Sequence, residues 1–192
     1  MRKLFLLPLL VPAFACSDNM PVEPEPAVYP DLGQVQTATL NGNGAKPVPF
    51  KAKGTVAILG MVPGCGTDEG LLSVSVEGEM RATHTGRSTM AMTNCWIAGE
   101  TGLEEFIETE TGTITAANGD VLYIHGSAED FGTTHPFYPD GSWEFGPLHF
   151  VGGTGRFEGA VGEFDLWGTI DETGMAGTFI AEGWISSVGS SK

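Results

Sequence analysis

Apolar and polar residues alternate along most of the chain from about residue 50 onward, with the period of two that is typical of strands with one buried face. The clearest run is 72–81, where apolar residues and glycine at even positions oppose Ser, Glu and Arg at odd positions. Weaker versions of this pattern predict seven further strands, namely 50–58, 88–96, 105–116, 122–126, 143–151, 162–170 and a last one that ends near Ser187.

Turn residues separate these segments. Asn118-Gly119 is typical of a two-residue type I′ hairpin, and Pro139-Asp140-Gly141 and Asp171–Gly174 predict two more turns. No amphipathic helix is long enough to cover a sheet. The pattern therefore predicts an all-β domain over 46–192. An eight-stranded antiparallel barrel is favoured because closure removes exposed sheet edges, and a β-sandwich is the alternative.

The composition supports this fold class. Glycine accounts for 28 of 192 residues and charged residues for only 17%. Each glycine costs a helix about 1 kcal/mol relative to alanine, whereas tight turns and closely approaching strands favour it. The roughly 145 residues after Ala45 are enough for one domain with a substantial core.

The first residues indicate export. Arg2 and Lys3 precede an uncharged, Leu-rich run over 4–15, and we interpret 1–15 as a signal peptide. That run is too short to cross a bilayer, which needs roughly 20 helical residues. Ala13-Phe14-Ala15 and then Cys16 resemble the lipobox of bacterial lipoproteins, although that family prefers Leu where Ala13 stands. The alternative is plain secretion, which would leave Cys16 as a free thiol.

Residues 16–45 form the predicted tether. Four prolines lie between acidic residues in its first half, and such segments stay extended. Ser17 after the cysteine resembles the pattern that sorts lipoproteins to the outer membrane, if the host has one. We therefore expect a lipid on Cys16 to be the membrane contact of an otherwise exported domain.

The charge excludes two classes of partner. Asp and Glu number 24 and Lys and Arg only 9, which gives a formal charge of −15, and removal of Arg2 and Lys3 makes the mature chain more acidic. Nucleic acids and anionic lipid head groups both require a basic surface. We therefore expect no nucleic-acid partner and no electrostatic docking on a membrane.

Cys65 and Cys95 are the only cysteines besides Cys16. In an exported protein, a disulfide between them is the default. A metal site would need further ligands, and no His or Cys stands nearby at a ligand spacing such as C-x-x-C.

Residues 152–162, with the sequence GGTGRFEGAVG, resemble the G-G-T-G-x-F-x-x-A-x-G signature of the allene oxide cyclase and dirigent barrel superfamily. They resemble even more closely a branch of bacterial secreted proteins with that barrel. The stretches 48–51, 82–87 and 116–120 fit the same branch and occur in the same order. The resemblance covers about residues 48–187 and implies an eight-stranded antiparallel barrel.

The physical interpretation of this motif is structural. Its glycines permit positive φ angles and close backbone approach, so the chain can fold over one barrel mouth while the phenylalanine plugs it. A phosphate-binding loop would need a following Lys, and a dinucleotide fingerprint would need a helix to open. The residues concerned are Gly152, Gly153, Gly155, Phe157, Gly159 and Gly162.

The sequence shows no recognisable catalytic centre. No G-x-S-x-G elbow is present, and the four histidines are scattered without a zinc-binding spacing, so we expect no catalytic residue, metal or cofactor. His84 and Arg87 are the most interesting polar candidates. Either they lock a hairpin, or they contact a ligand at a barrel mouth.

The leading hypothesis is a non-catalytic module of the cell envelope that binds a small apolar ligand or serves a structural role. One alternative is a cyclase or isomerase that confines a small apolar substrate, and another is a surface adhesion or matrix protein. A cavity would be lined by the apolar faces of the strands, including Val74, Val76, Met80, Met90, Met92, Phe164 and Leu166.

Overall fold

The structure is a computed structural model that describes residues 46–65, 68–99, 102–127 and 138–186. The chain divides into two compact units, Met1–Gln34 and Val35–Lys192, and every described residue belongs to the second. The predicted signal peptide, the tether and Cys16 lie outside the described residues.

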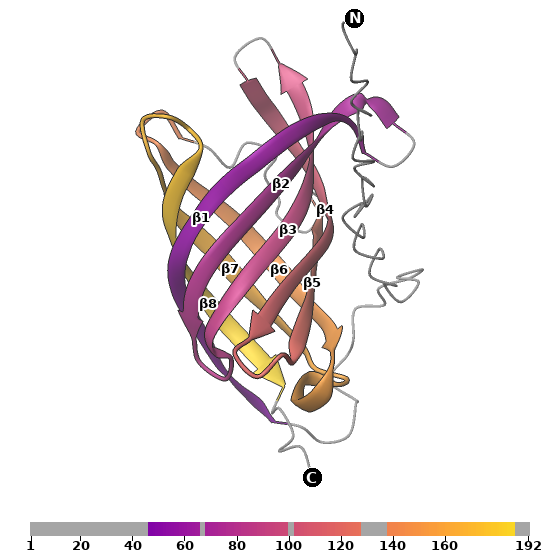
Figure 1. The fold of residues 1–192 in the computed structure, drawn as a ribbon, viewed down its shortest axis with the longest axis vertical. Coiled ribbons are helices and arrows are strands. Elements are labelled where there is room, and N and C mark those ends of the chain that lie inside the picture. The colour runs from indigo at the N-terminus through magenta and orange to yellow at the C-terminus, as the bar shows by residue number, and fades with distance from the viewer. Residues whose placement is uncertain (1–45, 66–67, 100–101, 128–137, 187–192) are drawn as a thin grey trace, which may run out of the picture. The chain divides into compact units, whose positions relative to one another are not determined.

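The described part of the chain forms one closed antiparallel barrel of eight strands (Figure 1). Each strand pairs with its neighbours in the sequence, and β8 pairs back onto β1. The predicted fold class is confirmed. The strands are β1 (Pro47–Cys65), β2 (Asp68–Ala82), β3 (Gly86–Gly99), β4 (Gly102–Ala116), β5 (Val121–Ser127), β6 (Ser142–Gly153), β7 (Val161–Ile170) and β8 (Ala176–Ser186).

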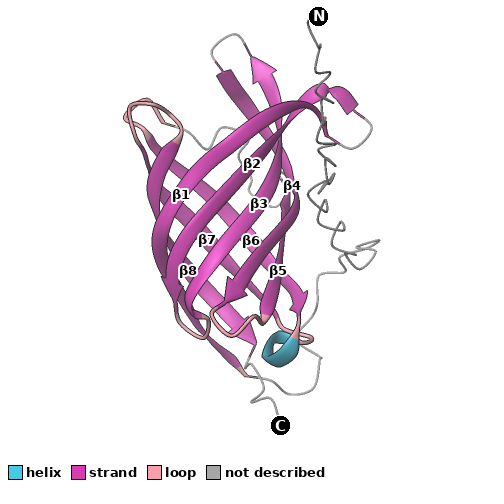
Figure 2. Cartoon of the chain, viewed as in Figure 1, coloured by secondary structure: helices cyan, strands magenta, loops and turns pink. Residues whose placement is uncertain are grey.

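Helix is almost absent from the described residues (Figure 2). A single turn of 3₁₀-helix, η1 (Gly155–Phe157), lies between β6 and β7, within the glycine-rich motif. None of the described helical residues forms a segment that is long and apolar enough to span a bilayer.

The first strand is longer than the alternation predicts. A register shift against β2 between Ile58 and Gly60 leaves Leu59 without a partner, which is the geometry of a β-bulge. The bulge ends the even-numbered inward pattern, yet pairing with β2 continues to Cys65. The predicted strand 50–58 is therefore only the part of β1 that lies before the bulge.

The barrel has a closed half and an open half. The closed half contains the β2–β3, β4–β5 and β6–β7 turns, and there β1 pairs with both β2 and β8. Pairing of β1 with β8 stops at Ala57 and Ala176, so the rest of β1 pairs with β2 alone. Likewise, the described pairing of β5 with β6 stops at His125 and His149. Every residue of β8 is nevertheless paired with β1, so the barrel stays closed. In the open half, β1–β3 and β6–β7 form opposite walls of its interior.

Three phenylalanines from different strands fill the closed half. Phe50 of β1 lies 4.9 Å from Phe150 of β6 and 5.4 Å from Phe164 of β7, measured between ring centroids, and all three are buried. Phe157 of η1 belongs to the same apolar cluster and is 0% exposed. The structure thus places Phe157 where the sequence motif predicts a plug.

Inward-facing glycines allow the strands to approach this packed interior. A Cβ atom at Gly162 would clash with the carbonyl oxygen of Trp184, and one at Gly168 would clash with that of Thr178. Both acceptors lie on β8, next to β7. The high glycine content thus reflects close packing of neighbouring strands as well as turns.

The predicted disulfide between Cys65 and Cys95 is confirmed. The two Cα atoms lie 5.8 Å apart, and both side chains are buried. Cys65 is the last residue of β1, whereas Cys95 belongs to β3, and β2 runs between these strands. The bond therefore fastens the end of β1 that β8 does not pair with.

Replacing both cysteines by serine (Cys65→Ser with Cys95→Ser) is expected to lower the free energy of unfolding by roughly 3–4 kcal/mol, because it releases a loop closed across 30 residues. Urea denaturation followed by circular dichroism measures this change. A reductant should lower the unfolding midpoint of the natural protein and leave that of the double variant unchanged. Equal midpoints for the oxidised protein and the variant would contradict the stabilising role.

Candidate ligand-binding site

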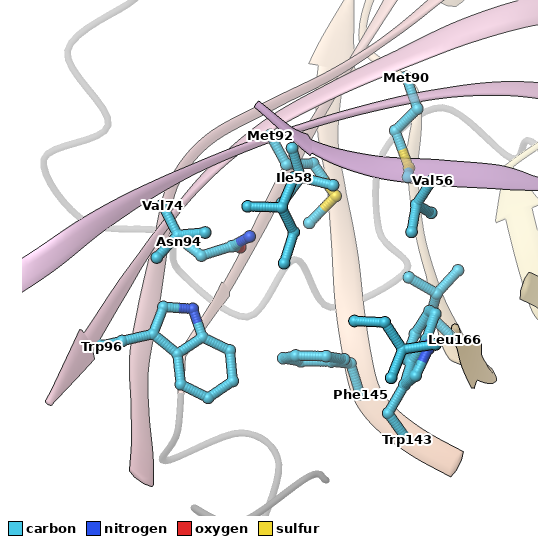
Figure 3. A pocket seen from close by; sticks show the side chains of 12 residues that line it. Val56, Ile58, Val74, Met90, Met92, Asn94, Trp96, Trp143, Phe145 and Leu166 are labelled. Carbon is cyan, nitrogen blue, oxygen red and sulfur yellow. The ribbon is translucent and has the colours of Figure 1, made fainter. Parts of the chain in front are cut away.

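An apolar recess of about 70 Å³ lies inside the open half of the barrel, between opposite parts of its wall (Figure 3). Twelve described residues line it, and eleven of them are apolar or aromatic. One wall comes from β1–β3 and consists of Val56, Ile58, Val74, Val76, Met90, Met92, Asn94 and Trp96. The other wall comes from β6 and β7 and consists of Trp143, Phe145, Leu166 and Ile170.

Aromatic rings bridge the two walls. The Phe145 ring meets the Trp96 ring edge-on, with centroids 5.8 Å apart and an interplanar angle of 87°. On its own sheet, Phe145 also lies 5.6 Å from Trp143. Figure 3 shows the Phe145 ring pointing from the β6 side into the middle of the recess. The indole rings thus border the space that Phe145 enters.

The walls favour burial of apolar surface. Two methionines add flexible, polarisable side chains that adapt to an irregular ligand. Asn94 is the one amide among the described lining residues, and it is 6% exposed. Apolar transfer stabilises a complex by roughly 25 cal/mol for each Å² removed from water. The chemistry of the recess is therefore that of hydrophobic binding.

The volume limits what fits. Pockets that enclose a drug-sized ligand measure about 300–1,000 Å³, several times the volume of this recess. The recess therefore has the size of a small group rather than of a whole drug-sized ligand. A longer molecule would place only one end in it and leave the rest at the rim.

The structure brings five of the predicted lining residues together. These are Val74, Val76, Met90, Met92 and Leu166. The other two, Met80 and Phe164, lie in the packed cluster of the closed half, where they are 4% and 2% exposed. All seven side chains point into the barrel, so the alternation correctly predicted which face of each strand is buried. Alternation does not reveal the level along the barrel axis.

Sequence reasoning did not name the aromatic part of the site. Trp96 lies on the inward face that the alternation of 88–96 predicts. Trp143 and Phe145 alternate correctly with Glu144, but the Gly146-Pro147 pair interrupts the pattern before Leu148. The sequence signal for Trp143 and Phe145 was therefore short: two apolar residues in alternation, followed at once by the interruption at Gly146-Pro147.

His84 and Arg87 lie in the half opposite the recess, at the β2–β3 turn. His84 has a φ angle of 67°, and its Nε2 lies 3.0 Å from the carbonyl oxygen of Pro49 on β1. The Thr83 hydroxyl donates to the same carbonyl oxygen at 3.2 Å. Arg87 pairs with Glu79 at 3.8 Å, and both side chains are largely exposed. These contacts attach the turn to β1 and tie β2 to β3.

The glycine-rich motif also lies at the closed end. Gly155 has a φ angle of 55°, and a Cβ atom there would clash with the carboxylate of Asp120 in the β4–β5 turn. That carboxylate accepts a hydrogen bond from the backbone N–H of Arg156 at 3.5 Å and pairs with its guanidinium at 3.6 Å. Two stretches that carry the family resemblance, 116–120 and 152–162, therefore contact each other and close the barrel.

Two carboxyl groups in turns of the open half have a lowered pKa. The hydroxyl of Ser142 donates to Asp140 at 2.6 Å and lowers the pKa of that carboxyl. The hydroxyl of Thr173 does the same for Asp171, also at 2.6 Å. In each case the hydrogen bond favours the ionised form. Both groups are fully exposed, so they place negative charge around the rim rather than in the recess.

Comparison with solved structures finds two dirigent proteins of low sequence identity. The chain is similar to the pterocarpan synthase dirigent protein PsPTS1, with a TM-score of 0.45 and 13% identity over 77% of this chain and 98% of that one. It is also similar to the pterocarpan synthase dirigent protein GePTS1, with a TM-score of 0.43 and 13% identity over 76% of this chain and 86% of that one. Matches at this level carry no conclusion about activity.

No protein-family model matches the sequence. No curated protein matches it at a significant level.

Proposed function

We propose that the barrel is a non-catalytic binding module that holds a small apolar ligand in the recess of the open half. The observation that carries this proposal is the contrast between the two halves of one interior. Phenylalanine rings pack together in the closed half, whereas an apolar space of about 70 Å³ remains inside the open half.

Binding is favoured over catalysis by the chemistry of the walls. The twelve described lining residues include no acid, base, hydroxyl or thiol. General acid–base and covalent catalysis both require such a group within reach of the substrate. A wall of this kind holds a ligand by burial and shape.

Exposed apolar side chains at the rim support a ligand that projects from the recess. Leu59 and Val62 of β1 are each 58% exposed, Met61 is 44% exposed, and Met175 of the β7–β8 turn is 42% exposed. The backbone N–H of Ile58 donates to the carbonyl oxygen of Met175, so the β1 and turn residues adjoin. Such a patch provides apolar contact outside the narrow space.

Benzene is a small apolar probe whose binding the tryptophan indole signals can locate. The chain has four tryptophans, two at the recess and two away from it. Trp96 and Trp143 line the recess. Trp184 lies on the outer face, where its Nε1–H donates to Glu163 at 3.0 Å, and Trp167 alternates with inward Leu166. In ¹H–¹⁵N NMR spectra of the full-length protein, benzene should shift the indole signals of Trp96 and Trp143 and leave the other two in place.

Two variants test the location of the ligand: one adds a phenyl ring inside the recess, and its matched control adds the same ring on the outer face of the barrel. Val76→Phe fills the recess and is expected to weaken benzene binding at least about tenfold, the discrimination that one missing or extra group gives in an apolar pocket. Ile180→Phe adds the same ring on the outer face, at a side chain that is 47% exposed, and should leave binding unchanged. Benzene-induced shifts that survive Val76→Phe would place the ligand elsewhere.

We also propose that the protein is exported and anchored to the cell envelope through a lipid on Cys16, in the outer membrane if the host has one. The support is the sequence alone: a basic start, a short apolar run, small residues before Cys16 and an acidic, Pro-rich segment behind it. That segment is long enough to hold the barrel away from the bilayer, since extended Pro-rich chains span about 3.1 Å per residue.

Intact-mass analysis of the protein from its native host tests the anchor. The mature chain is expected to begin at Cys16 and to carry the additional mass of a lipid. Cys16→Ser should abolish that mass. A mature chain that begins at Cys16 without any modification would rule out lipidation and leave plain secretion.

A further inference from the structure

Phe145 occupies a special place in the recess. It is the residue that packs against both apolar clusters of the described barrel, the large one that continues into the closed half and the small one formed by Val74 and Trp96. Its ring reaches across from β6 to meet Trp96 on β3 (Figure 3). The Phe145 side chain therefore lies between the two apolar clusters and separates them.

The backbone directs this ring inward. Phe145 pairs with Leu166 of β7, and a register shift follows before Leu148 pairs with Phe164. Gly146, within the shift, has a φ angle of 153°, and a Cβ atom there would clash with the Asp165 side chain. Only glycine fits, so the bulge is built into the sequence. It lets Trp143 and Phe145 face inward on one side of the shift while Leu148 and Phe150 face inward on the other.

Phe145 is also less enclosed than its aromatic neighbours. Trp96 is 2% exposed and Trp143 is 5% exposed, whereas Phe145 is only half-buried. Displacing a half-buried side chain forfeits less apolar burial than displacing an enclosed one.

We propose that Phe145 sets the size limit of the ligand. In the observed position its ring leaves room for one small ring or alkyl group, and a larger ligand binds only by displacing it from Trp96. This inference rests on the proposed binding function and adds the residue that determines specificity. The ligands concerned are neutral and apolar, because the lining residues offer no charged group.

Benzene and naphthalene, which differ by one fused ring, test the limit. In the full-length natural protein, benzene should bind at the recess, and naphthalene should bind more weakly. Phe145→Ala is expected to strengthen naphthalene binding at least about tenfold and to change benzene binding much less. Affinities come from NMR titration of the Trp96 and Trp143 indole signals.

Two further variants control for misfolding and for the loss of an aromatic side chain elsewhere in the barrel. Phe145→Leu removes less volume, so it preserves more packing if Phe145→Ala fails to fold, and it should give an intermediate gain for naphthalene. Trp167→Ala deletes an aromatic side chain from the outer face of the neighbouring strand and should change neither affinity.

The outcomes separate the two proposals. Benzene binding at the recess, with equal naphthalene affinity in the natural protein and both Phe145 variants, overturns the role of Phe145 and leaves the binding function standing. Absence of binding by either probe to any of the folded proteins overturns the binding function and this inference with it. A gain for naphthalene in Phe145→Ala that Trp167→Ala reproduces also overturns the role of Phe145.

Discussion

Pairing of β8 with β1 closes the sheet into a barrel, and the rest of the structure depends on this closure. β8 pairs with β1 along its whole length, from Ala176 opposite Ala57 to Ser186 opposite Pro47. Inside this closed wall, the rings of Phe50, Phe150 and Phe164 pack together at one end, and an apolar recess remains toward the other. One barrel interior therefore has a packed end and a hollow one.

The features that the sequence motifs carry are concentrated at the packed end. The Asp120 carboxylate accepts a hydrogen bond from the backbone N–H of Arg156, and the Phe157 side chain is fully buried. The side chains of His84 and Thr83 both contact the carbonyl oxygen of Pro49. The first contact joins the β4–β5 and β6–β7 turns, and the last two attach the β2–β3 turn to β1. The hollow end depends instead on β-bulges at Leu59 and Gly146 and on the disulfide that fastens the end of β1. Motif residues thus stabilise the scaffold, and less regular segments shape the site.

The sequence predicted the strands and their inward faces, because a period of two directly reports burial in a two-sided sheet. It also predicted the disulfide, from two cysteines in a chain with export features. It could not assign levels along the barrel: Met80 and Met90 follow the same inward pattern, yet only Met90 reaches the recess. A bulge moves the inward face to the other parity, as between Phe145 and Leu148. Alternation alone therefore did not assign Trp143 and Phe145 to the recess.

The interior of the barrel is thus packed at one end and hollow and apolar at the other. A crystal structure determined under xenon pressure tests this division, because xenon enters dry apolar cavities without needing a polar contact. Xenon density is expected between Trp96 and Leu166, and none among Phe50, Phe150 and Phe164. Density among those phenylalanines, or its absence between Trp96 and Leu166, would overturn this division of the interior.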